Sequence, residues 1–358
     1  MSALVRLQQF SLGSNEFSGT VPLGVSQWTS LNMLDLSNNK LEGSLDFIQN
    51  CSSLRIATLY GNSFSGSLPD LMNLDELVVF EVYDNQLDST LPAPLLSSLL
   101  LRTFDVSGNN LSGYIPEDLY NRPIITTLNL ARNQFTGPVA TFTSSSLTFL
   151  DLSDNQLSGN LNQLLYYRAS LLHIDISSNL FTGTIPSNLA LLSSVKSCNM
   201  SHNEIYGSLP ESINTLTALI EFSISHNQMQ QDLTEALQRL NVTGILRTVD
   251  LSYNQFSGSI PSNIAYFGDF MEEMDLSFNK LEGNLPVGVD LSFVINISGN
   301  DFTCPFPDSW INTEQVICTL NCCDESNNTG LQNESDSDSP ANLTPLWVTL
   351  GLLCAIVV

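Results

Sequence analysis

The sequence predicts an α/β-type repeat solenoid, mostly β. We expect a right-handed superhelix with a parallel sheet on its concave side and irregular or 3₁₀ segments on its convex side. Three observations predict this fold. An asparagine recurs 13 times at steps of 21 to 27 residues, two apolar residues precede it at alternate positions, and a glycine and a proline usually follow it. The repeated asparagines are Asn15, Asn39, Asn62, Asn85, Asn109, Asn133, Asn155, Asn179, Asn203, Asn227, Asn254, Asn279 and Asn300.

The residues before each repeated asparagine predict a short strand. In the coil of Asn254, Val249 and Leu251 lie five and three residues before it. An apolar residue at every second position is typical of a strand with one buried face. We therefore expect these side chains to point into the coil and the residues between them to point outward. The asparagine amide should bond the backbone of its own and of neighbouring coils, which would satisfy buried polar groups.

The residues after each asparagine predict a buried side chain, a tight turn and an extended segment. An apolar residue stands two positions later, a glycine follows in most coils, and nine coils then have an apolar–proline pair such as Ile260–Pro261. Glycine favours a tight turn and proline ends backbone hydrogen bonding, so the convex side should be irregular. The segment DLTEALQRL, residues 232–240, replaces this pattern in one coil and predicts a short helix.

The chain divides into four predicted regions. Residues 1–303 hold about 13 repeats, 304–323 form a cysteine-rich cap, 324–345 form a disordered acidic stalk, and 346–358 form an apolar membrane anchor. The last region has 13 uncharged residues, fewer than a spanning helix needs. It fits either a glycolipid-anchor signal or a truncated transmembrane helix. The chain starts inside a repeat without a signal peptide, so we expect its true N-terminus to lie further upstream.

Composition limits the possible partners. The 358 residues include 11 basic and 36 acidic ones, a net charge of −25, and 42% are hydrophobic. This charge argues against nucleic acid, which needs a basic surface, and disfavours adsorption to anionic lipid. The hydrophobic content is that of a folded protein.

Cysteine usage indicates an oxidising compartment. Four cysteines gather where the repeats stop, at Cys304, Cys318, Cys322 and Cys323. They predict a disulfide-bonded cap whose pairing the sequence leaves open, and their spacing is a poor fit to zinc. Cys51 and Cys198 occupy repeat positions that should be buried, as apolar fillers. Glycosylation sequons agree with an extracellular location, and those we expect to be used are Asn50, Asn110, Asn241, Asn327, Asn333 and Asn342.

Charged and titratable residues of the predicted concave face form the first candidate site. In the twelve coils after the first, the position four residues before the asparagine is acidic seven times. This column could bind a basic partner or a divalent cation. We favour a structural role instead, in which the aspartates form hydrogen bonds with nearby backbone. The histidines His173, His202 and His226 lie in three consecutive coils. His202 and His226 share a column about 5 Å apart, which would allow a pH-dependent or metal-assisted contact.

Aromatic residues on the same face give the better binding hypothesis. Tyr60 and Tyr83 are neighbours in one column, Tyr253 and Phe278 are neighbours in another, and Phe149 is expected to be isolated. Exposed aromatics often anchor an interface, although they can also be mere strand formers. The sequence shows no phosphate-binding loop, nucleophile elbow or acid–base set. We therefore expect no catalysis, no cofactor and no metal site.

The repeated phrase L-x-x-L-x-L-x-x-N-x-L/F-x-G-x-I/L-P resembles the plant-type leucine-rich repeat. This resemblance covers about residues 4–307. It implies either a membrane-anchored cell-surface antigen like those of kinetoplastid protists, which we favour, or the ectodomain of a plant receptor-like protein or kinase. The first would bind a protein, peptide or glycan outside the cell and the second would signal. An enzyme inhibitor and an intracellular scaffold are further alternatives.

Overall fold

The computed structural model describes residues 6–93, 95, 97–164, 170–240, 244–267, 270–311 and 315–318. These residues all belong to one compact unit, Met1–Cys322, and residues 323–358 lie outside the description. Several sequence predictions therefore fall outside the described residues. They are Cys322, Cys323, the stalk, the anchor and the sequons at Asn241, Asn327, Asn333 and Asn342.

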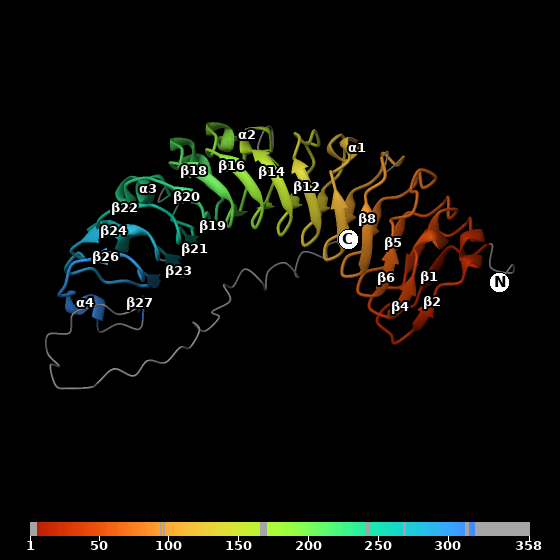
Figure 1. Ribbon diagram of the computed structural model, residues 1–358, viewed down its shortest axis with the longest axis horizontal. Coiled ribbons are helices and arrows are strands. Elements are labelled where there is room, and N and C mark those ends of the chain that lie inside the picture. The colour runs from red at the N-terminus through yellow and green to blue at the C-terminus, as the bar shows by residue number, and fades with distance from the viewer. Residues whose placement is uncertain are drawn as a thin grey trace. The chain divides into compact units, whose positions relative to one another are not determined.

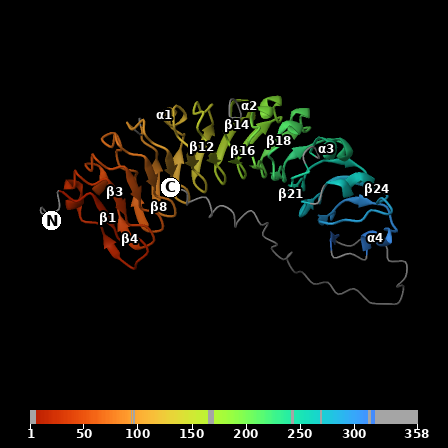
Figure 2. The same cartoon turned by 180° about the vertical axis from the view of Figure 1, so that it is seen from behind.

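A parallel sheet of 14 strands runs through the whole unit, one strand from each coil and one from the predicted cap. We call it the inner sheet, because it lines the concave side of the repeat unit (Figures 1 and 2). Its strands in order are β1 (Gln9–Ser11), β3 (Met33–Asp35), β5 (Ile56–Thr58), β7 (Val79–Glu81), β9 (Thr103–Asp105), β11 (Thr127–Asn129), β13 (Phe149–Asp151), β15 (His173–Asp175), β17 (Ser197–Asn199), β19 (Glu221–Ser223), β21 (Thr248–Asp250), β23 (Glu273–Asp275), β25 (Val294–Asn296) and β27 (Val316–Ile317).

Each strand pairs with its neighbour in the same register, so that equivalent positions of successive coils form columns. Leu150 on β13, for example, lies opposite Leu128 on β11 and Ile174 on β15. Their side chains are buried, and the residues on either side of them face outward. The alternation that predicted half-buried strands is thereby confirmed.

Further parallel strands follow the repeated asparagines, where the sequence predicted only a buried side chain, a tight turn and an extended segment. A 10-stranded sheet consists of β2 (Ser18–Thr20), β4 (Lys40–Gly43), β6 (Ser63–Gly66), β8 (Gln86–Thr90), β10 (Asn110–Gly113), β12 (Gln134–Pro138), β14 (Gln156–Asn160), β16 (Leu180–Gly183), β18 (Glu204–Gly207) and β20 (Gln228–Met229). A sheet of three strands continues with β22 (Ser257–Gly258), β24 (Lys280–Gly283) and β26 (Asp301–Phe302).

The side of the coils opposite the inner sheet carries short helices, as predicted. The 3₁₀ helices are η2 (Leu23–Gln27), η3 (Asp46–Ile48), η4 (Ser187–Leu191), η5 (Glu211–Thr215) and η6 (Ser262–Tyr266). The α-helices are α1 (Glu117–Tyr120), α2 (Leu161–Leu164), α3 (Leu233–Leu240) and α4 (Asp308–Ile311). Helix α3 confirms the helix predicted for residues 232–240. Among the described residues, no helix is both long enough and apolar enough to cross a bilayer.

One continuous hydrophobic core fills the space between the sheets and the helices. Phe80 and Phe104 are fully buried in adjacent coils, with ring centroids 5.7 Å apart. Cys51 and Cys198 are buried as predicted, and burial raises the pKa of the Cys51 thiol to about 11. Trp310 closes the C-terminal end of the core, and its indole N–H donates a 2.9 Å hydrogen bond to the Pro286 carbonyl.

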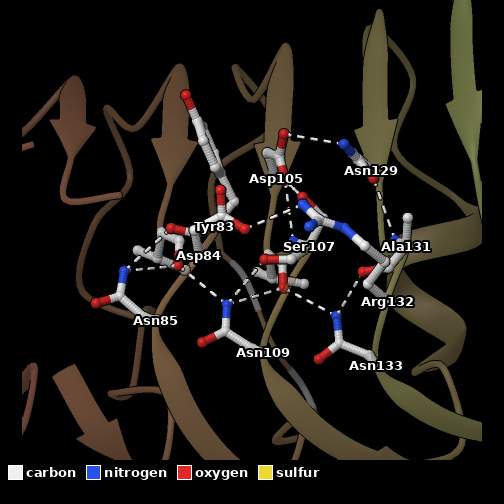
Figure 3. Close-up of polar contacts among 12 residues, drawn as sticks. Tyr83, Asp84, Asn85, Asp105, Ser107, Asn109, Asn129, Ala131, Arg132 and Asn133 are labelled. Atoms are coloured by element: carbon white, nitrogen blue, oxygen red, sulfur yellow. Dashed lines mark hydrogen bonds and ion pairs between the residues drawn. The ribbon is translucent and has the colours of Figure 1, made fainter. Parts of the chain in front are cut away.

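The repeated asparagines connect the coils through a ladder of side-chain hydrogen bonds (Figure 3). Asn109 donates from Nδ2 to the carbonyls of Val106 and Ser107 in its own coil, and to Val82 in the preceding coil, at 3.0–3.1 Å. Its Oδ1 accepts from the Leu87 backbone N–H at 2.9 Å. Each amide thus satisfies backbone groups that the turn leaves without partners, which confirms the predicted role.

Candidate functional site

The acidic column of the inner sheet is built chiefly into the fold. The Oδ1 of Asp105 accepts hydrogen bonds from the Ser107 backbone N–H and hydroxyl, at 2.9 and 2.7 Å. Its Oδ2 accepts from Asn129 Nδ2 in the next coil at 3.1 Å (Figure 3). Asp151, Asp175 and Asp250 bond the serine two residues on in the same way. These contacts support the interpretation of this column as structural.

Burial and neighbouring carboxylates raise the pKa values of several acidic residues of the inner sheet. Burial and the neighbouring Asp105 raise the pKa of Glu81 to about 7. Burial and the facing Asp175 raise the pKa of Asp151 to about 7. Near the C-terminal end, burial together with Asp275 and Asp250 raises the pKa of Glu273. Loss of a proton from these carboxyl groups is therefore less favourable than in water.

The pKa of Glu81 predicts a dependence of stability on pH. The folded-state pKa lies above the ordinary value of 4.5, so the folded protein binds more protons than the unfolded chain between pH 4.5 and 7. Glu81 therefore destabilises the fold as pH rises through this window. We expect Glu81→Gln to raise the melting temperature at pH 8 and to change it little at pH 4.5. An equal shift at both pH values would contradict the assignment.

Four aromatic rings form a continuous stack along the C-terminal half of the inner sheet. We call this stack, His202, His226, Tyr253 and Phe278, the aromatic ladder. Successive ring centroids are 3.9, 4.0 and 4.2 Å apart, and neighbouring rings are tilted by only 15–19°. Tyr253 and Phe278 remain 43% and 44% exposed. Because the rings cover one another's faces, the ladder presents their edges to solvent.

The backbone beneath the ladder adopts a conformation that bulky residues avoid. Each ring residue immediately precedes a repeated asparagine and has φ of 50–51°. This left-handed region costs about 1–2 kcal/mol for most side chains, whereas Gly, Asn and Asp tolerate it. The same conformation recurs before the asparagine of the other coils, at Ser14, Asn38, Gly61, Asp84, Gly108, Arg132, Asp154, Ser178 and Gly299. The left-handed backbone thus belongs to the repeat, and the ladder differs from the other coils in placing a ring there.

The imidazole of His226 is held toward its neutral form. Burial, and then the neighbouring His202, lower the pKa of His226 below its ordinary value, while Asp250 opposes the shift. The Nδ1 of His226 is buried and has no hydrogen-bond partner among the described residues. The predicted spacing of about 5 Å was too long, because the centroids of these two rings lie 3.9 Å apart.

Two shorter aromatic stacks lie elsewhere on the inner sheet. Tyr60 and Tyr83 stack at 4.2 Å, in agreement with their predicted column. Phe149 was expected to be isolated, which is wrong: its ring stacks on His173 at 4.6 Å and 12°. Both residues stand six positions before their asparagines and face each other directly on β13 and β15. Burial lowers the pKa of His173, while Asp175 and Glu221 oppose the shift.

The structure thus joins the predicted binding residues into three stacks, of which the ladder is the longest. The sequence indicated two separate pairs, His202–His226 and Tyr253–Phe278. Their equal position before the asparagine was the signal that could have joined them. An ion pair was also missed: Arg132 Nη2 lies 3.0 Å from Asp84 Oδ1, two coils away (Figure 3). It passes over Gly108, where a Cβ would overlap the Asp84 carboxylate.

The remaining predicted sites are only partly within the described residues. Asn50 and Asn110 are exposed, as glycosylation requires, while the use of these sequons stays a prediction. Cys304 and Cys318 are half-buried at the C-terminal end of the unit, and the disulfide prediction also involves Cys322 and Cys323, which are not described. Within the described ranges, no group of three or more His, Cys, Asp or Glu side chains could hold a metal ion.

Comparisons with known proteins identify the repeats. A family model described as Leucine Rich Repeat matches residues 30–51, 100–121, 146–167, 170–192 and 246–267. No curated protein sequence matches the chain.

Solved structures of plant receptors share the fold. The plant peptide hormone receptor RGFR1 in complex with RGF2 is 27% identical, with a TM-score of 0.69 over 87% of this chain and 56% of that one. The complex PEPR1–AtPEP1 is 27% identical, with a TM-score of 0.79 over 90% and 46%. The Arabidopsis receptor kinase HAESA ectodomain, with an IDA peptide hormone ligand, is 25% identical, with a TM-score of 0.66 over 90% and 64%. The chain spans about half the length of the first two.

Proposed function

Because the chain is a leucine-rich-repeat protein, we propose that it is an extracellular binding module that holds a protein or peptide ligand on its inner sheet and carries out no reaction. The observation that carries this proposal is the aromatic ladder, a row of stacked, partly exposed rings at a position that other coils fill with non-aromatic residues. The similar receptor structures support it, since those of RGFR1, PEPR1 and HAESA are named with peptide partners.

The geometry of the ladder favours a peptide over a glycan. Sugar rings bind aromatic residues by stacking on an open ring face. In the ladder, centroid separations of 3.9–4.2 Å leave no room between the rings. Gly299 also lies close to the ring of Phe278, where an added Cβ would overlap it. Exposed ring edges instead suit the side chains of an extended polypeptide.

Ligand binding should depend on the ladder while stability should not. We expect Tyr253→Asn combined with Phe278→Asn to weaken binding at least about tenfold, since buried aromatic anchors dominate interface energies. Asparagine relieves the left-handed strain as the stacking contacts are lost, and these effects are of similar size, about 1 kcal/mol. The free energy of unfolding should therefore change by less than about 1 kcal/mol.

The test uses ten-residue peptides selected from a random display library on the full chain, with their affinities measured by fluorescence anisotropy. The matched control is Tyr266→Ser combined with Phe270→Ser, which removes two aromatics that are 76% and 58% exposed in the coil segment containing η6. Unchanged affinity in the control and loss in the ladder variant support the proposal. A library that yields no binder, or binders indifferent to the ladder variant, would refute it.

A second candidate is the ectodomain of a signalling receptor. It is favoured by the names of the similar structures, which include a peptide hormone receptor and a receptor kinase. Both candidates place the repeats outside the cell. They differ in whether ligand binding is transmitted across a membrane, and a kinase or other signalling domain in the same gene product would decide for the receptor. The likeness to kinetoplastid surface antigens and the membrane anchor remain predictions.

A further inference from the structure

The surroundings of the aromatic ladder are acidic. Tyr253 and Phe278 each lie three residues beyond an aspartate, Asp250 at the end of β21 and Asp275 at the end of β23. Glu273 begins β23. Among the described residues none of these three carboxylates forms an ion pair, whereas the neighbouring Glu272 is held by Arg247 at 2.8 Å. Three carboxylates without an ion-pair partner among the described residues therefore accompany the exposed rings of Tyr253 and Phe278. Asp250 and Asp275 also accept hydrogen bonds from nearby serine and asparagine residues, which fix their positions.

We propose that the ladder and these carboxylates together bind an extended polypeptide segment rich in lysine or arginine. The proposal rests on the peptide-binding function above and specifies the chemistry of the ligand. Lysine and arginine side chains fit both parts of the surface, because their methylene stems pack along apolar ring edges while the charged heads reach carboxylates. Burial, and then neighbouring carboxylates, raise the pKa values of Glu273 and Asp275, and a bound cation would offset the repulsion between these groups.

The dimensions of the ladder suit a short extended segment. It crosses four coils, and its centroid separations of 3.9, 4.0 and 4.2 Å make it about 12 Å long. An extended chain rises about 3.3 Å per residue, which places four or five residues along the ladder and turns every second side chain toward it. Two or three basic side chains can then reach the row of Asp250, Glu273 and Asp275.

Charge argues against other occupants. A second copy of this chain would bring another net charge of −25 against the same acidic face. Nucleic acid and acidic peptides would be repelled in the same way. A basic segment gains from long-range attraction as well as from contact, and its affinity should therefore fall as salt screens the charges.

The test compares three synthetic fluorescent decapeptides with the same apolar residues and with lysine, serine or glutamate at four alternate positions. We expect the lysine peptide to bind the full chain at least about tenfold more tightly than the serine peptide, and the glutamate peptide not to bind. The lysine peptide should also lose about fivefold or more in affinity between 50 and 300 mM salt.

Two sets of variants locate the effect. Asp250→Asn with Asp275→Asn should weaken the lysine peptide at least about fivefold and leave the serine peptide unchanged. The fold tolerates this change, because Asn129, Asn199 and Asn296 occupy the same column and the first of them still accepts the backbone N–H two residues on. The matched control, Glu42→Gln with Glu282→Gln, removes two exposed carboxylates from β4 and β24.

The outcomes separate this inference from the proposed function. If library-selected peptides need the ladder but are neutral or acidic, or if the serine and glutamate peptides bind as tightly as the lysine peptide, only the basic-ligand inference fails. The basic-ligand inference also fails if the lysine peptide does not bind, or if the control variant weakens its binding as much as the Asp250 and Asp275 variant does. If no library peptide depends on the ladder, the peptide-binding function itself fails.

Discussion

Replacing Asn109 by alanine is expected to lower the free energy of unfolding by about 3 kcal/mol. Its amide donates to three backbone carbonyls in two coils and accepts from the Leu87 N–H. Alanine would leave these buried groups without partners, and each such group costs about 1–3 kcal/mol. Water that enters the gap would recover part of this loss, so the expected net loss is smaller than the sum. Urea unfolding followed by circular dichroism measures it.

Asn110 provides the matched control one residue away. Its side chain is exposed and its Oδ1 accepts a hydrogen bond from the Gln134 side chain. Asn110→Ala should change the free energy of unfolding by less than about 0.5 kcal/mol. Equal effects of the two substitutions would show that the hydrogen bonds of the repeated asparagines do not hold the coils together.

Replacing Phe104 by alanine should cost about 4 kcal/mol, the largest loss that we expect from a single substitution. The ring is fully buried and lies 5.7 Å from the ring of Phe80 in the preceding coil. Alanine removes this contact and leaves a cavity between two coils, because the paired strands β7 and β9 prevent the core from collapsing. The same urea titration at pH 7 measures the effect.

Two further variants make this result specific. Phe104→Leu keeps most of the apolar volume and should cost no more than about 1.5 kcal/mol. Phe270→Ala removes an exposed ring, 58% accessible, and should be nearly neutral. If Phe104→Ala were as mild as Phe270→Ala, the rings of successive coils would not share one interior and the solenoid would be wrong.

The fold could be predicted from the sequence because a repeat turns one-dimensional spacing into columns in space. The interval between asparagines gave the coils, and the apolar residue pairs such as Leu150 and Leu152 gave the strand and its buried face. The role of each repeated asparagine followed from the same regularity, since every coil faces the same backbone groups. The helix α3 was predictable because its residues break the pattern with good helix formers.

The site was predictable only as far as its columns. Aligning the repeats on their asparagines placed His226 and Tyr253 on the same face. Their coils differ in length, however, and the contact between the rings at 4.0 Å depends on side-chain rotamers. The wrong prediction that Phe149 is isolated has the same origin. His173 was considered only as a titratable group and not as a ring on which Phe149 could stack. The pKa values of Glu81 and Asp151 depend on burial by neighbouring coils, which no single repeat reveals.

Site-specific photo-crosslinking tests the central claim most directly. Benzoylphenylalanine at position 253 places the reactive group on the aromatic ladder, and at position 266 it places the group on the exposed Tyr266 site at the end of η6. With a library-selected peptide bound to the full chain, we predict crosslinks from position 253 and none from position 266. Crosslinks from position 266 alone would show that the ligand avoids the inner sheet, and would contradict the account.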